Sequence, residues 1–283
     1  MTTTTPNPGP PPPPMPSTGP KPVPGTGVPP SYHLWLIAGS LLTVGVLAMF
    51  TANVIGLLAH EVVTEVTRVP AADVVLLDVR DADGKVEVVG GQVDEITVTA
   101  KVSHGLRPTR YRVDVEDRVL VIRSSCPFLS SWCGVDQRIT VPADLPVQAS
   151  SDNGRITLQD LTGPVTASCD NGALELTRLS GDLQVDSNNG RVDGSGLESQ
   201  LVNARSSNGF VRLMFSEAPK TVTASSSNGY VDIVVPDTPI AYRVVAESSN
   251  GSTDVDVRTD PSSDRTIVAN SSNGQVKVRY PTG

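Results

Sequence analysis

VQASSDNG, residues 147–154, is the first of seven copies of one eight-residue segment, and this recurrence decides the fold. The other six copies are VTASCDNG (165–172), LQVDSNNG (183–190), VNARSSNG (202–209), VTASSSNG (222–229), VVAESSNG (244–251) and IVANSSNG (267–274). Their shared asparagines are Asn153, Asn171, Asn189, Asn208, Asn228, Asn250 and Asn273. The period therefore opens at 18 residues and lengthens to 23. A self-similar period of this length predicts stacked structural repeats, here the coils of a β-solenoid.

Alternation of side-chain character runs through every copy. The first, third and fifth positions are apolar or small, and the second and fourth are mostly polar. This pattern predicts a strand with one buried face, so Val147, Ala149 and Ser151 of the first copy are expected to point inward. Asn and Gly then turn the chain, because both tolerate positive φ at little steric cost. A second short strand follows, with Ile156 and Leu158 inward.

An antiparallel meander is the competing fold, because Asn-Gly between alternating runs is also the strongest signal for a β-hairpin. A meander has no need of identical side chains at every second turn, whereas a solenoid stacks identical positions in columns. The recurrence favours the solenoid, in which the seven Asn would form one hydrogen-bonded ladder. We therefore predict an all-β, single-domain, β-helix-like solenoid of about seven 18–23-residue coils, with Lys277, Arg279 and Pro281 protecting its far edge.

Residues 73–146, ahead of the repeats, contain further strand-like runs, and Asp83-Gly84 repeats the turn dipeptide. We predict that this region is an irregular first coil that caps the solenoid of residues 147–283, because an uncapped stack exposes an edge that pairs with other chains. Residues 60–72 are expected to be a linker.

The amino-terminal segment has a different composition. The first 30 residues hold 13 of the 24 prolines and one charged side chain, Lys21, so residues 1–33 are predicted to form a disordered, Pro-rich tail. This tail is expected to act as a solvated spacer, with a ligand for aromatic grooves as the alternative. Residues 34–59 contain no charge over 26 positions, more than the roughly 20 needed to span a bilayer. We predict one transmembrane helix there, an uncleaved anchor rather than a signal peptide.

Charge sets the expected orientation and excludes one class of partner. The positive-inside rule slightly favours a cytoplasmic amino terminus, which puts the region after the span outside the cytoplasm. With Lys21 set aside, 21 Lys and Arg face 30 Asp and Glu, a balance of about −9 for that region. Such an acidic surface argues against nucleic acid. Ala48, Ala52 and Gly56 form a small-residue stripe through which two helices could dimerise.

The chain has three cysteines. Cys126 and Cys133 flank the segment PFLSSW, and in an oxidising compartment they could close a small disulfide loop. Free thiols are the alternative, and zinc is disfavoured because it needs about four ligands and no His or further Cys lies nearby. Cys169 replaces the Ser151 of the preceding copy and is expected to be a small buried filler.

Catalytic patterns are weak in this sequence. Its three histidines, His33, His60 and His104, lie outside the copies, so the repeat serines have no base beside them. Asp152 and Asp170 fall in adjacent coils and could collect calcium, but later copies carry Asn or Ser there, which favours structural turn residues. We predict no catalytic site, no cofactor and no metal site. A polysaccharide-active β-helix enzyme, with Asp and Lys or Arg gathered in a groove, is the alternative.

The residue directly after each Asn-Gly is expected to point outward. Along the seven copies it is Arg155, Ala173, Arg191, Phe210, Tyr230, Ser252 and Gln275. Phe210 and Tyr230 should be neighbours on one face and are the candidate contact for a ligand or partner. Exposed aromatic rings can stack on sugars or anchor a protein, although a cross-strand pair that only steadies the sheet is the alternative.

The arrangement resembles the bacterial putative-adhesin family, domains of unknown function that are membrane-anchored or secreted β-solenoids. The resemblance rests on VEVVGGQVDEITVTAKV (86–102), ITVPADLPV (139–147) and the SSNGxV segments that begin at Ser206, Ser226 and Ser271. It implies a cell-envelope protein, linked in some relatives to envelope stress systems, and provides no catalytic residues to carry over.

Together these observations predict a non-enzymatic, single-pass protein of the bacterial cell membrane, with an extracytoplasmic, adhesin-like β-solenoid for binding or scaffolding. Its expected partner is an envelope glycan or a membrane protein. The alternatives are the polysaccharide-active enzyme and an accessory subunit of an envelope-stress system that binds another membrane protein.

Overall fold

A computed structural model describes residues 30–58, 61–104, 108–126 and 133–281 of the chain. The chain divides into two compact units, Met1–Thr51 and Ala52–Gly283.

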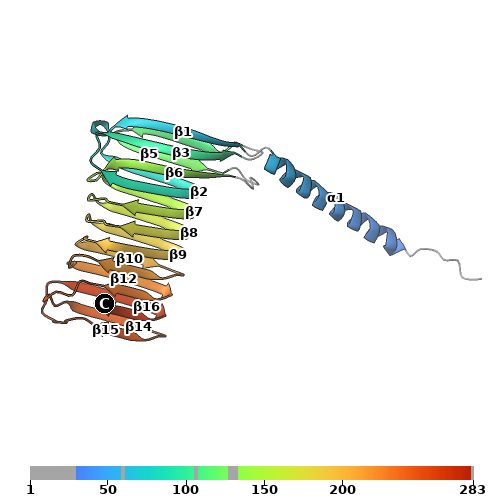
Figure 1. Cartoon of the computed structure of the whole chain (residues 1–283). Coiled ribbons are helices and arrows are strands. Elements are labelled where there is room, and N and C mark those ends of the chain that lie inside the picture. Colours follow the sequence, from blue (N-terminus) through green and yellow to red (C-terminus); the bar gives the residue numbers. More distant parts are fainter. Residues whose placement is uncertain (1–29, 59–60, 105–107, 127–132, 282–283) are drawn as a thin grey trace, which may run out of the picture. The chain divides into compact units, whose positions relative to one another are not determined.

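The amino-terminal part contains one described element, α1 (Pro30–Leu58) (Figure 1). Its large side chains, Trp35 and Phe50 among them, are exposed. Across the described residues, no helix is both long enough and apolar enough to cross a membrane, so the transmembrane helix expected at residues 34–59 is not supported. Residues 1–29 of the predicted Pro-rich tail lie outside the described residues.

After the end of α1, the second unit consists of strands joined in one sheet, with a short 3-10 helix, η1, after the first strand. The elements are β1 (Glu61–Pro70), η1 (Ala71–Asp73), β2 (Leu76–Gly91), β3 (Glu95–His104), β4 (Arg110–Glu116), β5 (Val119–Ser125), β6 (Gly134–Pro142), β7 (Val147–Gln159), β8 (Val165–Thr177), β9 (Leu183–Leu197), β10 (Leu201–Ser206), β11 (Val211–Phe215), β12 (Thr221–Asn228), β13 (Val231–Val234), β14 (Arg243–Ser248), β15 (Thr253–Asp256), β16 (Thr266–Asn273) and β17 (Val276–Arg279).

Each copy of the repeat forms one coil, and neighbouring coils pair in parallel with equivalent residues opposite one another. Asn153 lies opposite Asn171, and Asn171 lies opposite Asn189. In β7, β8 and β9 one strand runs through the Asn-Gly pair, whereas in later coils a short bend there separates two strands. This parallel register excludes the antiparallel meander and confirms the predicted all-β, solenoid-like fold.

Burial follows the predicted alternation. The inward Val147, Ala149, Ile156 and Leu158 of the first copy are 4% exposed or less, and their equivalents in most other copies are as deeply buried. The inward Ser or Cys residues of the copies together form one column. In this column Ser206 donates a hydrogen bond to the carbonyl oxygen of Gly190 at 3.0 Å. The core is therefore continuous along the stack because each coil covers the apolar face of the next.

The region before the repeats adds one coil in register and then changes direction. β2 pairs with β7 so that Asp83 lies opposite Asn153 and Gly84 opposite Gly154. On its other side β2 pairs in parallel with β5 and β6. Beyond them, β3 is antiparallel to β6, and β4 is antiparallel to β5.

The segment expected to be a linker, residues 60–72, is instead largely a strand. β1 pairs antiparallel with β3 along its whole length, from Glu61 opposite His104 to Pro70 opposite Glu95. It lies at one end of the stack (Figure 1). Exposed charges such as Glu65 suit an edge strand, because they discourage pairing with a second chain.

The last two copies do not stack in sequence order. β16 pairs with β12 on one side and with β14 on the other, and β17 likewise lies between β13 and β15. The copy at residues 267–274 therefore lies between the copies at 222–229 and 244–251, and β14 and β15 form the far end of the stack (Figure 1). The expectation that Lys277, Arg279 and Pro281 protect that end is wrong.

Burial and loop length together explain this order. Ile267, Ala269, Val276 and Val278 of the inserted copy are all 0% exposed, whereas the end coil has Thr253 where the others have Val, Ile or Leu. A coil with less inward apolar surface loses less hydrophobic stabilisation when only one side is covered. The connection before β14 is eight residues long, against five before β8, so it can span the additional coil spacing of about 5 Å. The nine residues before β16 then return the chain by one coil.

Candidate binding face along the Asn-Gly edge

The asparagines of the seven copies form an uninterrupted ladder of side-chain hydrogen bonds along one edge of the solenoid. Each Nδ2 donates to the Oδ1 of the preceding coil: Asn171 to Asn153 at 3.1 Å, Asn189 to Asn171 at 3.0 Å, Asn208 to Asn189 at 2.9 Å, Asn228 to Asn208 at 2.8 Å, Asn273 to Asn228 at 2.9 Å and Asn250 to Asn273 at 3.0 Å. The ladder follows the spatial order of the coils. Hydrogen bonds in such a chain polarise one another, which makes this edge stiff.

The glycine after each Asn is required by close approach of neighbouring coils. A Cβ built on Gly172 or Gly190 would lie 1.7 Å from the carbonyl oxygen of the preceding glycine, and the other repeat glycines leave no more than 2.1 Å. In the part of the chain that the structure describes, none of the ladder asparagines has a positive φ, so the turn conformation expected of Asn is not used. The glycines leave a bare strip of backbone beside the ladder.

The residues that follow these glycines form a second column, which we call the post-glycine column. In stack order it consists of Lys85, Arg155, Ala173, Arg191, Phe210, Tyr230, Gln275 and Ser252. Phe210 and Tyr230 are neighbours, and their rings stack with centroids 4.8 Å apart and planes 5° from parallel. Both side chains are half-buried.

Arg212 fixes the aromatic pair from the adjacent outward column. Its Cζ lies 5.7 Å from the centroid of Phe210 and 5.8 Å from that of Tyr230, and its Nη2 donates to the Tyr230 hydroxyl at 3.1 Å. Its Nε lies 3.6 Å from Asp232, a buried carboxylate to which Arg279 also donates two hydrogen bonds of 3.0 Å. The pair is therefore held in one orientation before any ligand arrives.

Two surface grooves meet at this aromatic pair. One, of about 680 Å³, has the glycine backbone as its floor and is lined by Arg155, Ala173, Arg191 and Phe210. The other, of about 480 Å³, is lined by polar and charged side chains that include Tyr230, Gln275 and Lys277. Phe210 thus borders one groove and Tyr230 the other.

Charge in the larger groove is partly compensated. Glu175 Oε1 lies 3.4 Å from Arg155 Nη1 and 2.8 Å from Arg191 Nη2, so two guanidinium groups share one carboxylate. Arg191 Nε is buried and has no hydrogen-bond partner. These three side chains together carry one net positive charge in a domain that is otherwise acidic.

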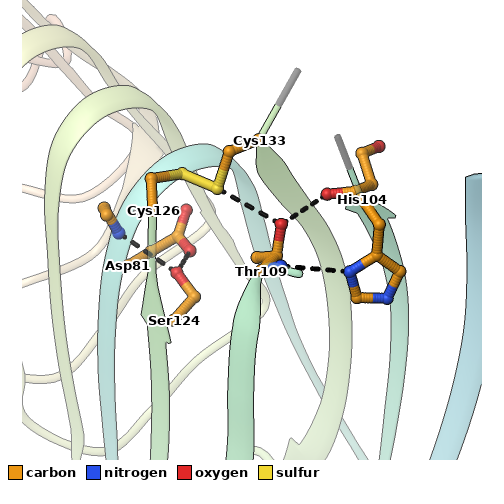
Figure 2. Close-up of a disulfide and its surroundings, with 8 residues drawn as sticks. Asp81, His104, Thr109, Ser124, Cys126 and Cys133 are labelled. Carbon is orange, nitrogen blue, oxygen red and sulfur yellow. Dashed lines mark hydrogen bonds between the residues drawn. A yellow bond between two sulfur atoms is a disulfide. The ribbon is translucent and has the colours of Figure 1, made fainter. Parts of the chain in front are cut away.

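Other predicted positions lie away from this face. Cys126 and Cys133 form a disulfide in the capping region, with Cα atoms 5.6 Å apart (Figure 2). Thr109 Oγ1 lies 3.3 Å from Cys133 Sγ, and its backbone N–H donates to His104 Nδ1 at 3.1 Å. The intervening segment, residues 127–132, lies outside the described residues. Cys169 is a buried free thiol, and burial raises its pKa.

The described residues contain no group of three or more His, Cys, Asp or Glu placed to hold a metal ion. Asp152 and Asp170 lie in adjacent coils, as expected. Asp170 accepts a hydrogen bond of 2.7 Å from Asn188 in the next coil, which is a structural use of the carboxylate.

Sequence reasoning missed Asp81, a buried carboxyl beneath the disulfide region (Figure 2). It occupies in β2 the inward position that Ser151 occupies in β7, and Ser124 donates a hydrogen bond to it. Burial, followed by the charges of Asp83 and Asp136, raises its pKa to about 6. Alignment of Asp83-Gly84 with the Asn-Gly pairs was the available signal, because it assigns Asp81 to the inward fifth position.

The chain is similar to one protein family and to several solved structures. The Toastrack DUF4097 family matches residues 139–282, about half of the chain. Similar solved structures include a putative cell adhesion protein from Clostridium sporogenes, with 12% identity and a TM-score of 0.38 over 78% of this chain and 100% of that one. A putative adhesin from Bacteroides fragilis has 12% identity and a TM-score of 0.39 over 78% and 97%. A putative lipid binding protein from Parabacteroides distasonis has 9% identity and a TM-score of 0.27 over 77% and 97%. No curated protein matches the chain.

Proposed function

The chain belongs to the Toastrack DUF4097 family, which confirms its resemblance to the putative-adhesin family, and from this premise we propose that it is a non-enzymatic glycan-binding module of the bacterial cell envelope. Its contact surface is the stacked pair of Phe210 and Tyr230. The observation that carries the proposal is the position of this fixed pair at the junction of two surface grooves.

Preorganisation makes the aromatic pair suited to binding. Arg212 contacts both rings and hydrogen-bonds the Tyr230 hydroxyl, so little side-chain entropy remains to be lost when a ligand settles on the pair. A ring that stacks on only one side keeps its other face for a flat apolar partner, such as the carbon face of a sugar. Rigid aromatic anchors of this kind dominate many binding surfaces.

The carboxylates beside the grooves support a binding role over a catalytic one. Glu175 is engaged by Arg155 and Arg191, and Asp232 by Arg212 and Arg279. A general acid or base has to exchange a proton with the substrate, and a carboxylate held by two guanidinium groups is poorly placed for that.

Location at the bacterial cell membrane, with the β unit outside the cytoplasm, is part of the proposal. Its support in the structure is the disulfide between Cys126 and Cys133, a bond that persists in oxidising compartments. The run of 26 uncharged residues at 34–59 supports it from the sequence alone, since the described helix does not meet the requirements of a membrane span. The test is cell fractionation followed by protease treatment of intact cells. A β unit that sediments with membranes and is cleaved from outside agrees with this location, and recovery in the cytosolic fraction contradicts it.

Binding is tested by a pull-down of the purified full chain on isolated cell-wall glycans. The double variant Phe210→Ala, Tyr230→Ala is compared with a control double variant, Gln148→Ala, Gln184→Ala. The control alters two exposed residues that precede the Asn-Gly pair of their copies and lie outside both grooves. Circular dichroism checks the fold of each. We expect wild type and control to bind and the aromatic variant to lose binding. Equal binding by the aromatic variant, or no retention of the wild type on the glycans, refutes the proposal.

A further inference from the structure

The shape and charge of the larger groove, in addition to its aromatic residue Phe210, indicate what kind of glycan it would hold. Resting on the proposed function, we propose that this groove binds an acidic glycan, with a sugar ring on the free face of Phe210 and a sugar carboxylate on the guanidinium groups of Arg191 and Arg155.

Space for such a ligand results from one small residue in the post-glycine column. Ala173 separates Arg155 from Arg191, and the glycine column supplies a floor without side chains. Two coil spacings of about 4.8 Å put the backbones of the two arginines roughly 10 Å apart. The groove is therefore an open trough with a cation on each side of its gap and an aromatic ring at one end.

The ring of Phe210 has one face available. Tyr230 covers the other face at a centroid distance of 4.8 Å, and the next residue of the column on the free side is Arg191. A pyranose stacked on the free face would therefore have its substituents close to the Arg191 side chain. This places one apolar contact and one charged contact within the reach of a single sugar residue.

The two arginines have unused capacity for an anion. A guanidinium group has five N–H donors, and the contacts to Glu175 use Nη1 of Arg155 and Nη2 of Arg191. Because Arg191 Nε is buried, a ligand has to use the remaining Nη donors of the two arginines, which line the groove. A planar carboxylate can accept two parallel N–H bonds from such a fork, which makes it a better fit than a neutral hydroxyl.

The acidity of the whole chain further limits the class of ligand that the groove would bind. Its net charge is −8, which disfavours dense polyanions at long range, whereas salt screens that repulsion beyond about 8 Å. A local excess of one positive charge suits a short ligand with at most one carboxylate on each sugar ring. A uronic-acid oligosaccharide has this character, and a nucleic acid or a highly sulfated polymer does not.

The test uses isothermal titration of the full chain with three probes: tetragalacturonate, its methyl ester, and heparin. The ester keeps the ring and removes the charge. We expect tetragalacturonate to bind most tightly, and Arg191→Ala to weaken it about tenfold while changing ester binding less than twofold. Phe210→Ala should weaken both sugars.

Glu175→Gln supplies a test that misfolding cannot imitate, because we expect this variant to gain affinity. Removing the competing carboxylate should raise affinity for tetragalacturonate about threefold and leave the ester unchanged. Glu247→Gln, which removes an equal charge from an exposed position on β14, is the matched control and should have no effect.

Two groups of outcomes overturn the inference. Equal affinity for acid and ester, or no gain in Glu175→Gln, removes the charge preference but leaves the glycan-binding proposal intact. Tighter binding of heparin, or no binding of either sugar by a chain that the cell-wall pull-down retains, shows that the ligand class is different. Failure of the proposed function itself is seen separately, as loss of all retention in that pull-down.

Discussion

Asp81→Asn is expected to stabilise the β unit by about 2–3 kcal/mol at pH 8 and to change its stability little at pH 4. Asp81 is 4% exposed. Burial first, then repulsion from Asp83 and Asp136, raises its pKa from 3.8 to about 6. A shift of roughly two units at about 1.36 kcal/mol per unit means that ionised Asp81 disfavours the folded state by about 3 kcal/mol.

The sign of the pH dependence follows from proton binding. An acid whose pKa is raised by folding binds more protons in the folded state than in the unfolded state. The wild type is therefore relatively most stable below the unfolded pKa of about 4, loses stability as pH rises, and has lost the full amount above a pH of about 6. The Asn variant cannot ionise and lacks this loss.

The substitution also fits the local contacts. The oxygen of Asn can accept the hydrogen bond that Ser124 now donates to Asp81. The nearby Gln137 side chain is buried and interacts with Asp81, and its amide oxygen has no hydrogen-bond partner, so this oxygen can accept from the new N–H donors. No cavity is created, because Asp and Asn have nearly the same shape.

The measurement is urea denaturation of the full chain, followed by circular dichroism at intervals from pH 4 to pH 8. Asp78→Asn is the control: Asp78 lies on the same strand, and its carboxylate is bound by Arg80 at 2.6 Å, so this variant should gain no stability at high pH. The reasoning is refuted if the Asp81→Asn and wild-type stabilities change in parallel across the range, or if the variant is the less stable protein at pH 8.

Three further predictions concern the solenoid. Gly190→Ala should destabilise the solenoid by more than about 3 kcal/mol, because the new Cβ would lie 1.7 Å from a backbone oxygen. Gly91→Ala should cost less than about 1 kcal/mol, because the atom nearest to its new Cβ is 3.8 Å away. Thermal unfolding compares the two variants, and equal losses of stability would contradict the close approach. Asn208→Ala removes two hydrogen bonds of the ladder, and Asn250→Ala removes one. Urea denaturation should therefore show a loss of stability of about 2 kcal/mol for Asn208→Ala and about 1 kcal/mol for Asn250→Ala. A larger loss for Asn250→Ala would argue against the ladder. Hydrogen exchange should be at least about tenfold faster in β14 than in β16, because β14 forms the end of the stack; the reverse order would mean that the copies stack in sequence order.

Much of the fold could be predicted because its signals are local and repeated. The alternation at Val147, Ala149 and Ser151 identifies the inward face without knowledge of any partner strand. Recurrence then assigns every copy to one stack and each ladder Asn to one column. The role of the glycines was only half understood, because contact between the backbones of neighbouring coils is not visible in a single copy.

The candidate face was predictable in part for the same reason. Its aromatic pair follows from the position after Asn-Gly, which places Phe210 and Tyr230 in adjacent coils. The contributions of Arg212 and Glu175 were not predicted, since each depends on which residue of the next coil lies beside it. Asp81 was missed because the cap coil was not aligned position by position with the repeats.

The sequence by itself determined the coil: its length, its inward and outward faces and the columns that result from stacking. Tertiary structure alone decided the order of the last coils, the pairing of β1 with β3 and the charge balance of the groove. The physical reason is that near-identical copies offer one another near-identical ladders and registers, so local preference cannot select among their neighbours. The choice depends instead on how much apolar surface each coil leaves uncovered at the end of the stack, which is a property of the assembled whole.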